Sequence, residues 1–236
     1  MKEIEIILID DCSNDDTIAI INKYMKEDPR IRLIKYQINR KILYSKSMAA
    51  LNSNSKYIFQ LDQDDLFIRN DVFDILYNEA ENNNLDLTQI RDIFINTLIL
   101  DKKIRLNFIG RHFIFLRKSK YNSASSHYKT LSEIKNKLFL KWMHFSIMGL
   151  IIKTDLYKIT VYYLWNYELI YYEDYLVSTF IAIISKRYKY LNNFALIHLN
   201  HKNCASNVYI KKFYISLLFF ANILSDYYIK IYPKDI

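Results

Sequence analysis

The first hundred residues alternate short β-branched runs with amphipathic segments of helical length, and this alternation is the strongest constraint on the fold. Strand patterns lie at residues 4–9, 31–36 and 57–61, and helical patterns at residues 18–27, 43–51 and 71–82. The run at 4–9 is almost continuously apolar, as expected for a strand buried on both faces. Strands separated by helices of this length predict βαβ units. We therefore expect an α/β fold with a mostly parallel sheet flanked by helices.

Two features of the sequence bear on where helices begin and how the chain turns. Ser13, followed three residues later by Asp16, predicts a capping box at the start of the first helix, whose apolar stripe is Ile18, Ile21 and Met25. Only two glycines occur in 236 residues. Turns that need a left-handed residue are therefore expected to use Asn.

The rest of the chain is less regular. Residues 88–141 lack a clear period, with a mobile loop expected at 117–137. A helix at 171–186, one or two strands at 188–199 and a final helix from Tyr209 are expected to follow. We predict a first part at residues 1–100, a second part at 101–208 and a C-terminal helix at 209–236, within one domain.

An acidic cluster follows the third predicted strand directly. Asp62, Asp64 and Asp65 fall within four residues and would repel one another without a cation. Hard divalent ions such as Mn²⁺ or Mg²⁺ take oxygen ligands and leave positions open for diphosphate oxygens. The alternative interpretation is a solvated loop whose aspartates cap the next helix.

A second acidic pair, Asp10 and Asp11, ends the first predicted strand. The carboxyl ends of parallel strands share one edge of a sheet, where ligands bind, so both acidic groups are expected at the same rim. A carboxylate there could accept hydrogen bonds from a nucleobase N–H or a ribose hydroxyl. Simple N-capping by Asp11 or Ser13 is the alternative.

These segments resemble family 2 glycosyltransferases. Residues 6–17, IILIDDCSNDDT, are similar to the family's IIVDDGSxDxT segment, and residues 56–65, KYIFQLDQDD, to its GEYIxFLDxDD segment. Between them, Asn39 and residues 45–49 stand where the family has an Asn and its ARNxG helix, with Lys46 in place of Arg. The order and spacing agree over residues 3 to 85.

The resemblance implies a GT-A fold, in which residues 1–100 would bind the nucleotide sugar and residues 101–208 would form the acceptor-side catalytic region. It also assigns roles to the acidic residues. Asp10, Asp11 and Ser13 would lie near the uracil or ribose of a nucleotide. Asp62 would lie near the ribose and the metal, and Asp64 would be the more direct metal ligand. The Mn²⁺ or Mg²⁺ ion would stabilise the departing nucleoside diphosphate as a Lewis acid.

The resemblance also implies a catalytic base. Residues 171–174, YYED, look like the family's (Y)ED motif, in which a carboxylate takes the proton of the acceptor hydroxyl. Asp174 is our first choice and Glu173 the alternative; a helix N-terminus would favour the ionised form. Ordinary acids complementing a helix dipole are the structural alternative.

A late segment gives a weaker signal. Residues 198–206, HLNHKNCAS, are similar to the family's YRxHxxSxS stretch, in which the His approaches the diphosphate or metal. His201 is the corresponding residue, although Asn200 replaces the usual Arg. A histidine on a surface loop explains the same pattern. Trp142 and His144 lie in the expected acceptor half, where a core role is the simpler interpretation.

The implied activity is sugar transfer from a nucleotide diphosphate donor, first of all a UDP-sugar, to a saccharide or glycolipid acceptor, with inversion, as in polysaccharide biosynthesis. A catalytically inactive sugar-nucleotide-binding or scaffold homologue is the alternative. The family's opening strand, roughly VSVIIPVYN, lies between the strands matched here by residues 4–9 and 57–61. It is not seen in this chain, which we therefore expect to be N-terminally truncated.

Charge and composition bear on partners and location. The net charge of +8 suits nucleotide phosphates and leaves peripheral association with a membrane open. No basic stripe is interleaved with aromatic residues, so nucleic acid is not an expected partner. Two cysteines without CxxC spacing favour the reducing cytoplasm, with the inner face of a membrane as an option. Residues 213–224 are expected to form a helix docked on the core rather than a membrane-surface helix.

Overall fold

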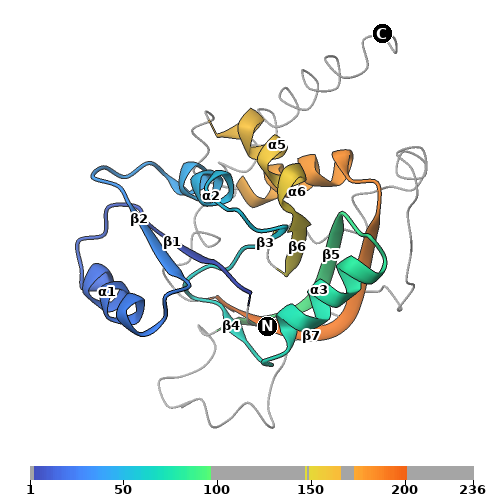
Figure 1. The fold of residues 1–236 in the computed structure, drawn as a ribbon, viewed down its shortest axis with the longest axis horizontal. Helices are drawn as coiled ribbons and strands as arrows, with labels where there is room; N and C mark the ends of the chain where they lie inside the picture. Colours follow the sequence, from blue (N-terminus) through green and yellow to red (C-terminus); the bar gives the residue numbers. More distant parts are fainter. Residues whose placement is uncertain (1–2, 97–146, 148, 166–172, 201–236) are drawn as a thin grey trace. The chain divides into compact units, whose positions relative to one another are not determined.

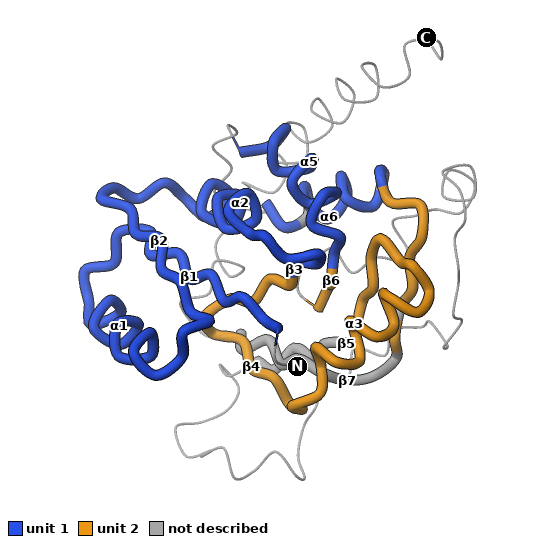
Figure 2. The backbone as a smooth tube through the Cα atoms, viewed as in Figure 1, with its two compact units in different colours: residues 1–58, 152–184, 213–236 blue, residues 59–151, 185–212 orange. Residues whose placement is uncertain are grey.

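The computed structural model describes residues 3–96, 147, 149–165 and 173–200 (Figure 1). The chain divides into two compact units, residues 1–58, 152–184 and 213–236, and residues 59–151 and 185–212 (Figure 2). Several predictions lie outside the described residues: the loop at 117–137, the final helix from Tyr209, Trp142, His144 and His201. The predicted domain boundaries at 100 and 208 also fall there and stay predictions.

The first unit contains the predicted βαβ unit. Strands β1 (Ile6–Asp10) and β2 (Ile31–Lys35) pair in parallel, joined by helix α1 (Thr17–Glu27). The register pairs Asp10 with Lys35, and the N–H of Tyr36 donates to the carbonyl oxygen of Asp10 at 2.9 Å. The carboxyl ends of both strands therefore meet, and the loops that follow them lie together.

The predicted burial of β1 is wrong. Ile6, Ile7, Leu8 and Ile9 are all half-exposed instead of buried on both faces. Among the described strands, β1 pairs with β2 alone. A strand with a single neighbour leaves part of its apolar side chains in contact with solvent.

The predicted capping box at α1 is also wrong. The helix begins at Thr17 with Asp16 as the N-cap residue, whose side chain makes no capping hydrogen bond. Instead, the Thr17 N–H donates to Asp15 Oδ1 at 3.0 Å, and the Ser13 N–H donates to Asp10 Oδ1 at 3.2 Å. The predicted apolar stripe of α1 is confirmed, because its three residues are half-buried: Ile18, Ile21 and Met25.

Three helices form the core of the first unit: α2 (Ile42–Leu51), α5 (Thr154–Leu164) and α6 (Glu173–Ile184). Helix α2 packs against α5, and α5 packs against α6. Their facing side chains are fully buried, among them Leu43, Ala50, Tyr157, Val161, Leu176 and Phe180. Burial of each large apolar side chain contributes about 1.5–3 kcal/mol. This packing fixes α6 relative to α2.

A five-stranded sheet has the order β3-β6-β5-β7-β4. Its strands are β3 (Tyr57–Phe59), β4 (Leu66–Phe67), β5 (Leu87–Asn96), β6 (Leu150–Lys153) and β7 (Tyr188–Asn200). Strand β5 runs parallel to β7, and β4 antiparallel to it. Strands β3 and β4 lie at the two edges of this sheet.

In the second unit, helix α3 (Val72–Asn82) covers β5 with its buried face of Val72, Leu76 and Ala80. The predicted bounds of this helix are confirmed to within one residue. No helix in the described ranges is both long and apolar enough to cross a membrane.

Strand β5 was not predicted, because its sequence does not follow the period of a half-buried strand. Thr88 and Gln89 are adjacent polar residues, yet both are fully buried. The hydroxyl of Tyr188 on β7 donates to Gln89 Oε1 at 2.7 Å, which satisfies the buried amide across the sheet. A hydrogen bond from a residue 99 positions away cannot be inferred from the local pattern.

Three described residues other than glycine have positive φ: Cys12 (72°), Lys41 (74°) and Asn84 (48°). Only Asn84 follows the expectation that Asn replaces Gly in such turns. Lys41, with ψ of 160°, occupies a region that is populated almost only by glycine. It is the N-cap residue of α2, and its N–H donates to Asn39 Oδ1 at 3.2 Å.

Lys41→Gly is expected to stabilise the chain by about 1 kcal/mol, because glycine removes the clash of the Cβ atom at this φ and ψ. Urea unfolding followed by circular dichroism measures the change. Lys41→Ala is the matched control, since it removes the same charged side chain but keeps the Cβ atom. Equal stability of the Gly and Ala variants would show that Lys41 is not strained.

Candidate active site

Asp10 ends β1 as a buried carboxylate, with 2% of its surface exposed. Oδ1 accepts the hydrogen bond from the Ser13 N–H, which joins two residues of the predicted nucleotide site. Oδ2 is also buried and has no hydrogen-bond partner among the residues that the structure describes. An unsatisfied buried acceptor carries a desolvation penalty. Oδ2 is therefore suited to a donor supplied by a ligand, such as a nucleobase N–H.

Asp11 connects the loop after β1 to the loop after β2 through hydrogen bonds. Its Oδ1 accepts from the Arg40 N–H at 2.7 Å, and its carbonyl oxygen accepts from Asn39 Nδ2 at 3.3 Å. Cys12 Sγ donates to the carbonyl oxygen of Gln37 at 3.4 Å. Neither Asp11 nor Ser13 caps α1, so the capping alternative for these residues is wrong.

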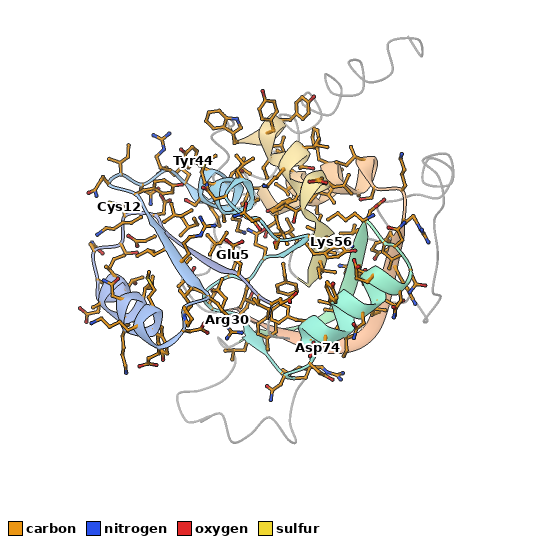
Figure 3. All side chains as sticks on the ribbon, in the orientation of Figure 1. Glu5, Cys12, Arg30, Tyr44, Lys56 and Asp74 are labelled. Atoms are coloured by element: carbon orange, nitrogen blue, oxygen red, sulfur yellow. The ribbon has the colours of Figure 1, made fainter. Side chains whose placement is uncertain are left out.

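An aromatic cluster that was not predicted lies next to this loop. The Arg40 guanidinium stands 4.4 Å from the ring centroid of Tyr44, which is labelled in Figure 3. Tyr44 in turn makes edge contacts with Tyr36 at 5.5 Å and Trp165 at 6.1 Å. Burial raises the pKa of Tyr36, and the neighbouring Tyr44 and Asp11 add to the rise. Within the first unit, the cluster joins residues 36–44 to Trp165, which is remote from them in sequence.

Helix α6 begins at Glu173, so both acids of the YYED segment stand in its first turn, as predicted. Lys46 of α2 donates to Asp174 Oδ1 at 2.8 Å and to Glu173 Oε1 at 3.3 Å. The side chains of Lys46, Glu173 and Asp174 are 12%, 10% and 25% exposed. The three residues form a largely buried charged cluster, which we call the Lys46 cluster.

The two acids of the Lys46 cluster are not equivalent. Burial, together with the neighbouring Asp174 charge, raises the pKa of Glu173 to about 7, and Lys46 opposes this rise. Near neutral pH, Glu173 therefore retains a proton for much of the time. Asp174 is more exposed and makes the shorter bond to the ammonium. Of the two, Asp174 has the better access for an acceptor molecule.

The Asp62–Asp65 segment belongs to the second unit and connects β3 to β4. The Asp65 N–H donates to the carbonyl oxygen of Asp62 at 3.2 Å, and this turn holds Asp62, Asp64 and Asp65 together, all half-buried. Asp10 and Asp11 lie in the first unit, so the predicted meeting of the two acidic groups at one rim stays a prediction.

The residues present fit a metal that is shared with a ligand. In the described part of the chain, no three His, Cys, Asp or Glu side chains are arranged to enclose an ion by themselves. Mg²⁺ needs only one or two carboxylates when substrate phosphates complete its octahedral shell. Half-exposed carboxylates on the Asp62–Asp65 turn match that requirement. His201, the third predicted ligand, lies outside the described residues.

Comparison with curated proteins finds glycosyltransferases. The chain is 36% identical over 87 residues to an uncharacterized glycosyltransferase of Haemophilus influenzae, covering 37% of this chain and 34% of that protein. It is 26% identical over 157 residues to the glycosyltransferase GlyG of Streptococcus pneumoniae, covering 61% and 51%. The matches thus span about half or less of these relatives.

The fold is also similar to that of a solved structure. The structure of S. aureus TarS 1–349 in complex with UDP-GlcNAc superposes with a TM-score of 0.67 at 18% identity, covering 93% of this chain and 57% of that one. This similarity confirms the predicted α/β, GT-A-like fold. The family model described as glycosyl transferase family 2 matches residues 1–148, well over half of the chain. The chain therefore belongs to glycosyl transferase family 2.

Proposed function

We propose that this chain transfers a sugar from a nucleoside diphosphate donor, a UDP-sugar, to a hydroxyl of a saccharide or glycolipid acceptor. The observation that carries the proposal is the Lys46 cluster, which places a partly exposed Asp174 at the start of α6 in a member of this family. The similarity to TarS, whose structure is described in complex with UDP-GlcNAc, supports the choice of donor.

Asp174 would act as the base. Its carboxylate accepts the proton of the acceptor hydroxyl as the hydroxyl oxygen attacks the anomeric carbon, and the bond to the diphosphate breaks. Attack on the face opposite the leaving group inverts the configuration. A positioned base contributes typically about 10²–10⁴-fold to the rate. Glu173, the alternative, is more buried and retains a proton for much of the time near neutral pH.

Both acidic groups would bind the donor. Asp10, through Oδ2, and Asp11 would recognise the base or ribose, and Asp62 the ribose. Asp64, with Asp62 and His201, would hold Mn²⁺ or Mg²⁺. When bound, the ion supplies Lewis-acid stabilisation of the leaving diphosphate. A glycolipid acceptor would bring the chain to the cytoplasmic face of a membrane.

Donor hydrolysis tests this function directly. The 236-residue chain is incubated with Mn²⁺ and a panel of UDP-, GDP- and dTDP-sugars, and release of the nucleoside diphosphate is measured. We expect release from one UDP-sugar, and chelation by EDTA is expected to stop it. Binding of the nucleotide without release, even with saccharide acceptors added, would support the inactive homologue. Absence of both binding and release would overturn the proposal.

A further inference from the structure

We propose that Lys46 is a positioning residue for sugar transfer, and that it acts by holding Asp174 Oδ1 so that Oδ2 takes the proton of the acceptor hydroxyl. This inference rests on the proposed function, because it assigns Lys46 a part in the same reaction. Lys46 reaches the acids from a different helix, 128 positions earlier in the chain.

The contact between Lys46 and Asp174 has the length of a charge-assisted hydrogen bond. The 2.8 Å separation between Lys46 Nζ and Asp174 Oδ1 is within the range of charge-assisted hydrogen bonds, about 2.7–2.9 Å. The separation from Glu173 Oε1 is longer, at 3.3 Å. A single ammonium therefore binds one acid firmly and the adjacent acid more loosely. The firm contact is to the acid with the greater exposure.

Burial explains why the ammonium is needed. Lysine is almost never buried unless it is paired, and the Lys46 side chain is 12% exposed. Two ionised carboxylates next to each other in this setting would repel strongly. The Lys46 ammonium offsets this repulsion and holds Asp174 through Oδ1, which leaves Oδ2 to take the proton of the acceptor hydroxyl.

The packing of the helices makes the contact rigid. Helix α5 packs against both α2 and α6, so the helices that carry Lys46 and the two acids are fixed relative to each other. On α2, Leu43 and Ser47 flank Lys46 and are both buried. Ser47 Oγ donates to the Leu43 carbonyl oxygen at 2.6 Å. Lys46 thus extends from an ordered helical turn and not from a loop.

Lys46→Met tests the proposal by removing the charge at similar side-chain length. We expect kcat to fall about 100-fold, as for a displaced catalytic group. The KM for the donor should stay within about twofold, because the lost contact acts in the transition state. Lys46→Arg keeps the cation and is expected to recover most of the lost kcat. A purely structural lysine would not separate kcat from KM in this way.

Lys158→Met is the matched control. Lys158 is a part-buried lysine of α5 in the same unit, and its Nζ donates to the Ser53 carbonyl oxygen at 2.7 Å without contacting either acid. Its loss is expected to lower stability but to leave kcat unchanged. Urea unfolding of all three variants shows whether each of them is folded.

Each outcome supports or overturns the positioning role of Lys46. A wild-type chain that turns over no donor overturns the proposed function and this inference with it. An active wild type with normal kcat in folded Lys46→Met overturns this inference alone. If Lys46→Met does not fold, Lys46→Gln replaces it, and a normal kcat there has the same meaning. If neither neutral variant folds, Lys46 is structural and the inference is wrong.

Discussion

Asp174→Asn is expected to lower the rate of sugar transfer by about 10²–10⁴-fold and to leave donor binding unchanged. Asn has nearly the same shape as Asp, and its amide oxygen can still accept the bond from Lys46. It cannot accept a proton from the acceptor hydroxyl. Initial rates with the best donor of the panel and calorimetric binding of UDP measure the two effects separately.

Glu173→Gln is the matched control for that experiment. Gln resembles the protonated acid, which burial favours at Glu173 near neutral pH. We therefore expect Glu173→Gln to keep most of the wild-type rate. The reverse pattern, with an active Asp174→Asn and an inactive Glu173→Gln, would make Glu173 the base. Full turnover in both variants would show that neither acid acts as the catalytic base.

Asp64→Asn is expected to weaken Mn²⁺-dependent binding of UDP by about 100-fold, while the fold stays intact. The substitution replaces an anionic ligand with a neutral amide, and hard divalent ions prefer carboxylate oxygens. Calorimetry with and without Mn²⁺ measures the change. Without the ion, wild type and variant should bind UDP equally weakly.

Asp65→Asn provides the comparison within the same turn. It removes one negative charge from the Asp62–Asp65 segment, as Asp64→Asn does, but is expected to have the smaller effect. Equal losses in both variants would indicate a general charge effect without a specific ligand. Unchanged UDP affinity in Asp64→Asn with Mn²⁺ present would rule out the metal assignment.

Apart from the two-residue strand β4, the order of elements from β1 to α3 was predictable because local periodicity determines it. Strand β2 was expected at 31–36 and spans Ile31–Lys35, and helix α2 was expected at 43–51 and spans Ile42–Leu51. Strand β5 was missed because its buried Gln89 depends on Tyr188, far along the chain. The burial of β1 was overestimated, since it depends on how many neighbouring strands are present.

The candidate site was predictable only where a motif is contiguous. The acidic segments at Asp10 and Asp174 were recognised because each lies in a short run of residues next to a strand or helix. Lys46 could not be linked to Asp174, nor Arg40 to Asp11, because these contacts join distant segments. The strain at Lys41 was also invisible, since the sequence of a turn does not show its φ and ψ angles.

The most direct test of the account is a crystal structure of the chain with UDP and Mn²⁺. We expect one Mn²⁺ ion, identified by its anomalous signal, bound to Asp64 and to both phosphates. The uridine is expected to contact Asp10 or Asp11. A nucleotide that touches one acidic group while the other faces away from it, or an ion remote from Asp64, would contradict the account.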